Sequence, residues 1–377
     1  MEELPLKLND KNDVATHVIN ILHRLGLLSA VRDCIDSVVI DSVRAFQQSR
    51  GLAVTGIVDS PTLRSLEEAR WKLGDRSLYL HPSPLMRGDD VATLQARLTE
   101  MGFNCGRVDG IFGDRSENAV REFQKSVGVT ADGKCGPATI TALMRLSRTV
   151  SGGAPVILRE SAIQKNRGPA LANKVIVLDP SCGGSDLGFQ GFGINEAEVV
   201  FDVAQRLEGR LLALGVSVFL TRGVNNSPSE NQRLAFANET NADLVISLHL
   251  DGYHNEKGHG VATYFYGSRD HGIHSVVGER FASIVQREIC ARTDLLNCRT
   301  HEKTWDLLRL TKAPAVRIDL GYASNSGDAE RLSRPDFRDV IAESVVIAIQ
   351  RLYLASEDDA KTGTLRLSDL RKAGIRK

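Results

Sequence analysis

Apolar and polar positions follow two different rhythms along this chain of 377 residues. In the first 150 residues, apolar side chains recur every three to four positions, which predicts short amphipathic helices. From Lys174 onward, apolar runs alternate with longer helical patterns. The predicted strands are 175–178, 216–220, 244–248, 260–266 and 315–320, and the predicted helices are 196–214, 230–238, 276–292, 328–332 and 338–354. We therefore expect an α/β C-terminal domain, a mixed sheet flanked by helices, after small all-α units.

The helical half of the chain contains an internal repeat. The segment from Asp13 to Gly56 and the segment from Asp90 to Gly133 share the same order of apolar, glycine and Phe-Gln positions. Each copy contains two amphipathic helical patterns and a weaker third, with glycines at the helix ends, so each is predicted to be a three-helix unit. The expected domains are 10–72, 86–149 and 174–355, followed by a flexible polar tail at 356–377.

Composition narrows the possible partners. The net charge is +0, which gives no reason to expect nucleic acid as a partner. The first ten residues hold no apolar signal-peptide core, and no run of eighteen apolar residues predicts a membrane span. We therefore expect a cytoplasmic protein without a membrane span. The six cysteines form no CxxC pair, and five of them are interpreted as small buried side chains.

Side chains that could bind a metal or take part in catalysis lie at or just after the ends of three predicted strands. Cys182 follows the first strand, His249 ends the third, and Asp319 lies at the end of the last. Glu196 begins the first long helix of this domain. Ligands bind outside the carboxyl ends of strands in α/β sheets, and Cys, His and carboxylates are metal ligands. Each residue also has a simpler interpretation: a buried thiol, a hydrogen-bonded histidine, a carboxylate favoured by the helix dipole, or a structural aspartate.

The repeats resemble peptidoglycan-binding repeats of bacterial wall hydrolases. The second copy carries the fuller signature, with Asp-Gly-Ile-Phe-Gly at 109–113 and Phe-Gln at 123–124. The first copy is degraded, since it has Asp-Cys-Ile-Asp at 33–36 where Asp-Gly-x-Phe-Gly is usual. The resemblance implies glycan binding by the second copy; the alternative is that both copies are only packing modules.

The C-terminal domain resembles the zinc-dependent N-acetylmuramoyl-L-alanine amidases. The matching motifs are Asp-Pro-Ser-Cys-Gly-Gly at 179–184, Glu-x-x-Val at 196–199, Thr-Arg at 221–222, Ser-x-His at 247–249 and Asp-Leu-Gly-Tyr at 319–322. The resemblance implies zinc ligands at Cys182, Glu196 and His249, a catalytic base at Asp319, and cleavage of the amide between the muramic lactyl group and L-alanine.

Two of these four positions depart from the family pattern, which has histidine and glutamate where this chain has Cys182 and Asp319. A thiolate ligand brings a longer bond, about 2.3 Å against about 2.0 Å for histidine, and a negative charge that leaves zinc less able to acidify its water. Aspartate is one methylene shorter, and a misplacement of about 1 Å can cost on the order of a hundredfold in rate. Together the departures predict weakened or lost hydrolysis.

These residues are compatible with two functions. One is an active amidase that cleaves peptidoglycan. The other, which we favour, is a pseudoenzyme that binds without cutting. The segment 291–310 is similar to an actinobacterial subgroup of the family, and that similarity implies a cytoplasmic regulator of peptidoglycan precursor synthesis that responds to phosphorylation. Its partners would be peptidoglycan fragments or precursor, a precursor-synthesis enzyme and a phosphopeptide-binding protein.

The polar tail offers two candidate phosphorylation sites, Thr362 and Thr364. A phosphate there would add a charge of roughly −1.5 to −2 and three acceptor oxygens. The alternative is an unmodified tail, which mass spectrometry of protein from native cells would distinguish.

Overall fold

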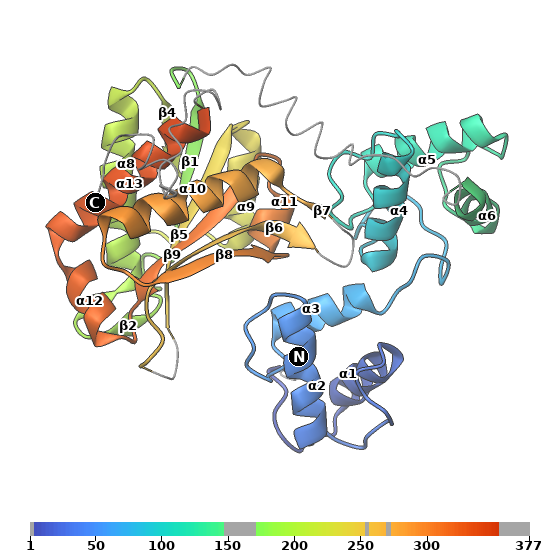
Figure 1. Cartoon of the computed structure of the whole chain (residues 1–377). Coiled ribbons are helices and arrows are strands. Elements are labelled where there is room, and N and C mark those ends of the chain that lie inside the picture. Colours follow the sequence, from blue (N-terminus) through green and yellow to red (C-terminus); the bar gives the residue numbers. More distant parts are fainter. Residues whose placement is uncertain (1–3, 147–170, 253–255, 269–272, 354–377) are drawn as a thin grey trace, which may run out of the picture.

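The computed structural model describes residues 4–146, 171–252, 256–268 and 273–353. Thr362, Thr364 and the whole segment 356–377 lie outside this range, so phosphorylation of the tail stays a prediction. The described residues form two helical units and one α/β unit (Figure 1). Among these residues, no helix is long and apolar enough to cross a membrane.

Each repeat folds into three helices around its own apolar core, as predicted. The helices of the first copy are α1 Asp13–Arg24, α2 Ser37–Ser49 and α3 Ser60–Ala69, and those of the second are α4 Asp89–Glu100, α5 Asp114–Val127 and α6 Pro137–Leu146. Phe46 and Phe123 are buried at equivalent places in the two cores. Asp36, one of the residues that replace the usual motif in the first copy, caps α2 by accepting a hydrogen bond from the Val39 N–H.

A buried glutamine occupies the equivalent position in both repeats. In the first copy the Gln47 side chain donates to the Ile57 carbonyl and accepts from the Gly56 N–H. In the second copy Gln124 makes the same two bonds, with the Lys134 carbonyl and the Gly133 N–H. The amide therefore satisfies the backbone of the turn before the third helix, which would otherwise carry unpaired buried groups.

The α/β unit is built on a mixed seven-stranded sheet. The strands run in the order β4 Ser217–Leu220, β1 Val175–Pro180, β5 Leu244–Asp251, β9 Ala315–Tyr322, β6 Val261–Ser268 and β7 Ile273–His274, and β8 Asn297–Lys303 pairs with β6. The pairs β4–β1, β1–β5, β5–β9 and β6–β8 are parallel, whereas β6 is antiparallel to β9 and β7. A small hairpin, β2 Gln190–Gly191 and β3 Ile194–Asn195, precedes the first helix of this unit.

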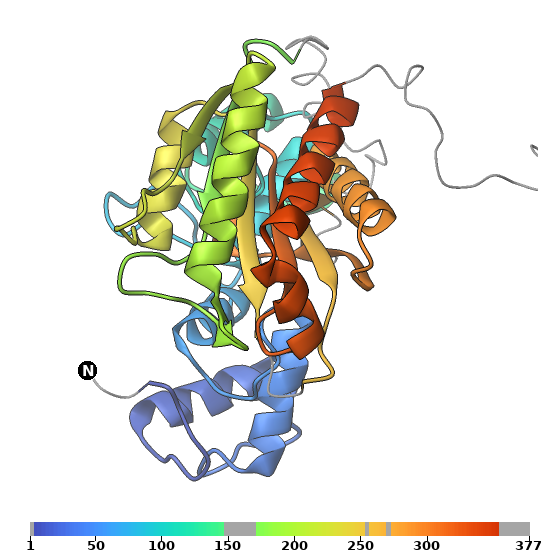
Figure 2. The ribbon, with the colours of Figure 1, turned by 90° about the vertical axis from the view of Figure 1, so that its left-hand side faces the viewer.

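Helices cover both faces of the sheet, as expected. The larger core contains α8 Glu196–Ala213, α10 Val276–Arg292 and α13 Pro335–Tyr353, together with residues of the short α12 Ser326–Ser333. The opposite face carries α9 Glu230–Glu239 and α11 Asp306–Leu310. Figure 2 shows α8 and α13 side by side on the near face of the sheet.

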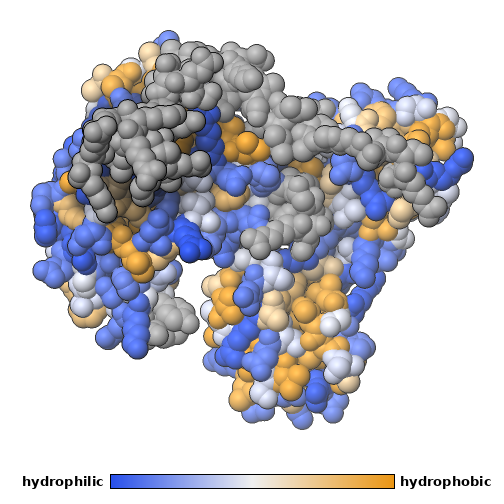
Figure 3. Space-filling model, viewed as in Figure 1, coloured by the Kyte–Doolittle hydropathy of each residue, from blue (hydrophilic) through white to orange (hydrophobic). Residues whose placement is uncertain are grey.

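The α9 and α11 face is also where the repeats dock. The Arg309 guanidinium on α11 donates two hydrogen bonds to the Glu68 carboxylate on α3, at 2.8 and 3.2 Å. The Thr304 hydroxyl donates to the Arg50 carbonyl at 2.9 Å, and the Tyr266 hydroxyl donates to the Val108 carbonyl at 2.9 Å. Both repeats therefore contact the α/β unit through β6 and the segment 303–311. On the face shown in Figure 3, a notch separates the α/β unit from part of the first repeat.

The predicted strands and long helices are confirmed to within a few residues at their ends. The prediction lacked β2, β3, β7, β8 and α11. The strand β8 has the sequence Asn-Cys-Arg-Thr-His-Glu-Lys, and its side chains are exposed or half-buried. Because it lies at an edge of the sheet, it has none of the apolar alternation that marks the central strands.

Candidate functional site

The candidate residues lie on one face of the central strands. Successive side chains of a strand point to opposite faces, so Leu248 and Ile318 enter the core under α8 and α10 while their neighbours His249 and Asp319 face the other way. The Cα atoms of His249 and Asp319 are direct partners in the β5–β9 register. The strands β5 and β9 thus place His249 and Asp319 side by side on one face of the sheet.

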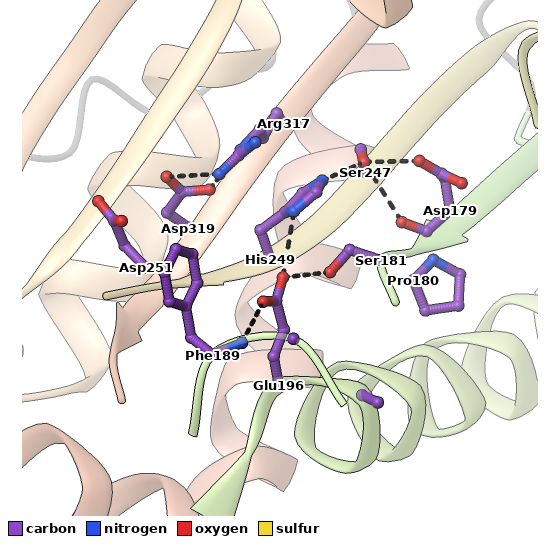
Figure 4. A network of polar contacts seen from close by, with 12 residues as sticks. Asp179, Pro180, Ser181, Phe189, Glu196, Ser247, His249, Asp251, Arg317 and Asp319 are labelled. Atoms are coloured by element: carbon purple, nitrogen blue, oxygen red, sulfur yellow. Dashed lines mark hydrogen bonds and ion pairs between the residues drawn. The ribbon is translucent and has the colours of Figure 1, made fainter. Parts of the chain in front are cut away.

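Glu196 and His249 form the centre of the site (Figure 4). The His249 Nδ1 atom lies 3.2 Å from the Glu196 Oε1 atom. The same carboxylate accepts hydrogen bonds from the Ser181 hydroxyl and, at 3.1 Å, from the Phe189 N–H. Burial would raise the pKa of Glu196, but hydrogen bonding with His249, Ser181 and Phe189 lowers it to about 2. The carboxylate is therefore ionised at neutral pH.

The two ring nitrogens of His249 face different partners. The Nδ1 atom faces Glu196, and the Nε2 atom lies 3.0 Å from the Ser247 hydroxyl, which donates to the Asp179 Oδ2 atom at 2.6 Å. Burial and the Arg317 guanidinium lower the pKa of His249, which favours the neutral ring. A ring nitrogen and an ionised carboxylate thus face each other, and both are donor types that zinc accepts.

Cys182 lies beside this pair in a strained loop. Its backbone has φ +53°, a conformation that L-residues rarely adopt. A Cβ atom added at Gly188 would lie 2.7 Å from the Cys182 Sγ atom and 2.5 Å from the Glu196 Oε2 atom, so sulfur and carboxylate border the same glycine. Burial, Glu196 and Asp186 raise the pKa of the Cys182 thiol to about 12. Without a metal the side chain is a neutral thiol.

The residues present fit a metal in part. Glu196 and His249 offer two convergent donors of the types that zinc accepts. Within the described ranges, however, no group of three His, Cys, Asp or Glu side chains is arranged to hold a metal ion. The three-ligand site at Cys182, Glu196 and His249 therefore stays a prediction.

Asp319 is held by an arginine that was not among the predicted site residues. The Arg317 guanidinium donates from Nε to Asp319 Oδ1 at 2.6 Å and from Nη2 to Oδ2 at 3.2 Å. On its other side the guanidinium stacks on the Trp305 ring, 4.6 Å from the centroid. Asp319 is only 3% exposed. Both oxygens of the predicted base are thus engaged with a permanent cation, which leaves the carboxylate poorly placed to take a proton.

A cavity of about 570 Å³ opens beside these residues. Its walls come from all three units: Arg50 and Glu68 from the first repeat, Asp109 from the second, and His249 and Arg317 among the residues of the α/β unit. This volume is within the usual range for small-molecule sites. The site is therefore bounded by the repeats as well as by the sheet.

Several residues of the site were not predicted. Arg317 could have been predicted from the sequence, because a charged residue two positions before Asp319 in an apolar strand must lie on the same face of the sheet. Ser181 and Ser247 had no such signal because hydroxyls are common at strand ends. Lys303 and Trp305 reach the site only through β8 and the docked first repeat, which no local pattern indicates.

Comparisons with known proteins agree with this architecture. The family model described as N-acetylmuramoyl-L-alanine amidase matches residues 176–351, and the putative peptidoglycan binding domain matches residues 17–66 and 87–143. The chain is 42% identical over 380 residues to the N-acetylmuramoyl-L-alanine amidase CwlM of Mycobacterium tuberculosis, covering 97% of this chain and 93% of that protein.

Other relatives match about half of this chain. The germination-specific N-acetylmuramoyl-L-alanine amidase of Bacillus subtilis is 29% identical over 205 residues, covering 50% of this chain and 83% of that protein. Among solved structures, the amidase AmiC2 of Nostoc punctiforme is 25% identical with a TM-score of 0.43, covering 47% of this chain and 94% of that chain. The full-length similarity to CwlM, with the matched domains, shows that this chain belongs to the N-acetylmuramoyl-L-alanine amidase family.

Proposed function

We propose that this chain is an amidase-family protein that binds peptidoglycan fragments or precursor with weak or no hydrolysis. The observation that carries the proposal is the pair between Arg317 and Asp319, in which a bidentate arginine holds the residue at the position of the family's base. A general base must be free to accept a proton from the attacking water. In the pair with Arg317, one lone pair on each Asp319 oxygen is taken up and the direction of the carboxylate is fixed, which disfavours this role.

The altered metal position supports the same proposal. Zinc would be held by Glu196 and His249 with Cys182 as the third ligand, and when bound it supplies Lewis acidity and an activated water. Binding there requires the Cys182 thiol to lose its proton, and the pKa of about 12 makes that loss costly. Burial and the neighbouring carboxylates of Glu196 and Asp186 cause this raised pKa, so the metal-free site disfavours the thiolate that the third ligand needs.

The proposed role is regulation of peptidoglycan precursor synthesis in the cytoplasm. All six cysteines are free thiols, which is the usual state in a reducing compartment. A precursor-synthesis enzyme and a phosphopeptide-binding protein are proposed as partners, as the resemblance of the segment 291–310 to an actinobacterial subgroup of the family implies. Peptidoglycan binding by the second repeat is part of the same proposal.

The second candidate, an active zinc amidase, is favoured by one observation. Glu196 and His249 keep the convergent pair that a metal would need. An assay of amide release from muropeptides, with zinc quantified on the same sample, separates the two candidates. The proposal predicts negligible release, whereas turnover at ordinary enzyme rates would establish the active amidase.

A further inference from the structure

Two cations share one aromatic surface at the inner wall of the cavity. Trp305 and Tyr264 pack with their ring centroids 4.8 Å apart. The Lys303 ammonium lies 5.4 Å from the Trp305 centroid and the Arg317 guanidinium 4.6 Å from it. Both side chains line the cavity. Like charges placed this close repel each other, and burial together with Arg317 lowers the pKa of Lys303.

The acidic groups around this cavity are already engaged. Asp319 accepts from Arg317, and Asp251 accepts from the Gly252 N–H at 2.8 Å. At the edge formed by the repeats, Asp89 pairs with Arg50, and Glu68 and Asp306 pair with Arg309. Among the described residues, no carboxylate lies within ion-pair distance of the Lys303 ammonium. Lys303 is thus a half-buried cation without a direct ion pair among the described residues, and Asp319 attracts it only at longer range.

Docking of the first repeat holds Lys303 in this place. A Cβ atom added at Gly51 would lie 2.7 Å from the Lys303 Cδ atom, so the backbone of the repeat packs directly on the lysine stem. The neighbouring Thr304 hydroxyl donates to the Arg50 carbonyl. The Nη1 atom of Arg317 takes no part in the pair with Asp319 and remains as a second donor.

We propose that Lys303 and Arg317 form an oxyanion subsite, which takes a carboxylate or phosphate of the ligand beside His249. The inference rests on the proposed function, since it names the chemistry by which the same cavity would hold a peptidoglycan fragment or precursor. A planar or tetrahedral oxyanion accepts from Arg317 Nη1 and Lys303 Nζ together, and it supplies the charge that Lys303 lacks. The aromatic pair excludes water from the contact and strengthens it.

Isothermal titration of the full chain tests the subsite with three probes: a disaccharide tetrapeptide with free carboxyl groups, the same molecule with its carboxyl groups amidated, and inorganic pyrophosphate. The Lys303→Gln variant is expected to bind the free tetrapeptide or pyrophosphate about tenfold more weakly than the wild type, as fits the loss of a charge-assisted hydrogen bond. If the anion is a carboxylate, amidation weakens binding to the wild type but not to Lys303→Gln. If the anion is a phosphate, Lys303→Gln weakens the binding of pyrophosphate but not that of the tetrapeptide.

Two control variants show whether an effect of Lys303→Gln comes from the charge at this position. Lys312→Gln removes an exposed lysine outside the cavity and should bind like the wild type, and Lys303→Arg should retain most of the affinity. Circular dichroism confirms that each variant folds. Unchanged affinity of Lys303→Gln for a probe that binds the wild type would overturn the subsite and leave the proposed function standing. Binding of pyrophosphate alone, lost in Lys303→Gln, would support the subsite and count against the tetrapeptide as ligand. A wild type that binds none of the probes would overturn both.

Discussion

Arg317 and Asp319 lie two positions apart on β9, so both side chains reach the same face of the sheet. The first is a permanent cation and the second is the residue at the position of the family's base. Their pairing neutralises the carboxylate and fixes its direction, while Trp305 holds the guanidinium from the other side. Under the proposed function, single residues oppose hydrolysis in two ways, through the metal position at Cys182 and through this pair.

Restoring hydrolysis should require two kinds of change: the family's residues at positions 182 and 319, and removal of the Arg317 cation beside position 319. The variant Cys182→His with Asp319→Glu restores the family residues, yet Arg317 still engages the carboxylate at position 319. We expect that adding Arg317→Leu raises amide release from muropeptides by about a hundredfold over the double variant, since a positioned general base contributes roughly 10²–10⁴. Initial rates measured in the presence of zinc check this.

Arg331→Leu, added to the same double variant, serves as the control because Arg331 pairs with Asp294 on the surface. Equal rates for the two triple variants would show that the arginine beside Asp319 does not restrain the site.

The sequence predicted Cys182, Glu196, His249 and Asp319 as site residues because each follows, ends or begins a strongly patterned element. It could not show how these residues are paired. The bond between Asp179 and Ser247, whose hydroxyl also lies beside His249, depends on the register of β1 against β5. Register is set by the pairing of strands across the whole sheet, so the sequence around a single serine does not indicate it.

At the scale of elements, the two helices beside one another on the outer face are joined by an ion-pair network. Asp202 on α8 accepts from Arg206 at 2.8 Å and from Arg338 on α13 at 2.6 Å. Asp339 on α13 accepts from Arg206 and Arg210. Burial raises the pKa of Asp202, but the bonds from Arg206 and Arg338 outweigh it, so the net shift is downward. The network therefore stabilises the folded chain only while these carboxylates are ionised.

This network predicts a pH-dependent contribution to stability. Because the pKa of Asp202 is lower in the folded state than in the unfolded state, its contribution is present above the unfolded value of about 3.9 and is lost as the pH falls through the folded value. Asp202→Asn should lower the free energy of unfolding by about 1 kcal/mol at pH 7, the upper range for half-exposed pairs. The difference from the wild type should shrink as the pH falls below about 4.

Thermal melts of both proteins across this pH range give the measurement. Glu343→Gln changes an exposed carboxylate on the same helix α13 and should have little effect at any pH. A difference between wild type and Asp202→Asn that stays constant down to pH 2 would exclude an ionic origin.

Elements with strong periodicity were predicted, and those defined by tertiary contact were not. The strand β5 begins with the apolar run Leu-Val-Ile and is buried along most of its length, and its existence was predicted from the sequence alone. The strand β8 is polar and helix α11 has only five residues, and this region is ordered by β6 and by the first repeat. Since they carry Lys303 and Trp305, the part of the site that was missed is the part built on these elements.

At the scale of the whole molecule, the repeats are walls of the cavity. The contact between Arg309 and Glu68 joins α11 to α3, with side chains only 14% and 20% exposed. The same segment carries Trp305, which packs on Arg317. Docking of the first repeat is thereby connected to the restraint on Asp319 through three adjoining contacts. No pattern within one unit predicts this, because each unit has its own core.

Glu68→Gln should loosen the docking, because a neutral amide cannot form the bidentate charged pair with Arg309. We expect amide hydrogens of 303–311 to exchange about tenfold faster, which corresponds to a loss of about 1.4 kcal/mol in local stability. Hydrogen exchange followed by mass spectrometry checks this. The matched control is Glu67→Gln, since Glu67 pairs with His17 and Arg70 within the first repeat. Equal exchange in the two variants would argue against a docking role for Glu68.

The measurement that bears most directly on the central claim is amide release from muropeptides by the purified wild-type chain, with bound zinc quantified on the same sample. The account predicts turnover below about 0.01 s⁻¹ even with added zinc, at least a hundredfold under the lower end of ordinary enzyme rates of about 1–10³ s⁻¹. Release at about 1 s⁻¹ or faster would contradict it, because a base held by Arg317 could not support that rate.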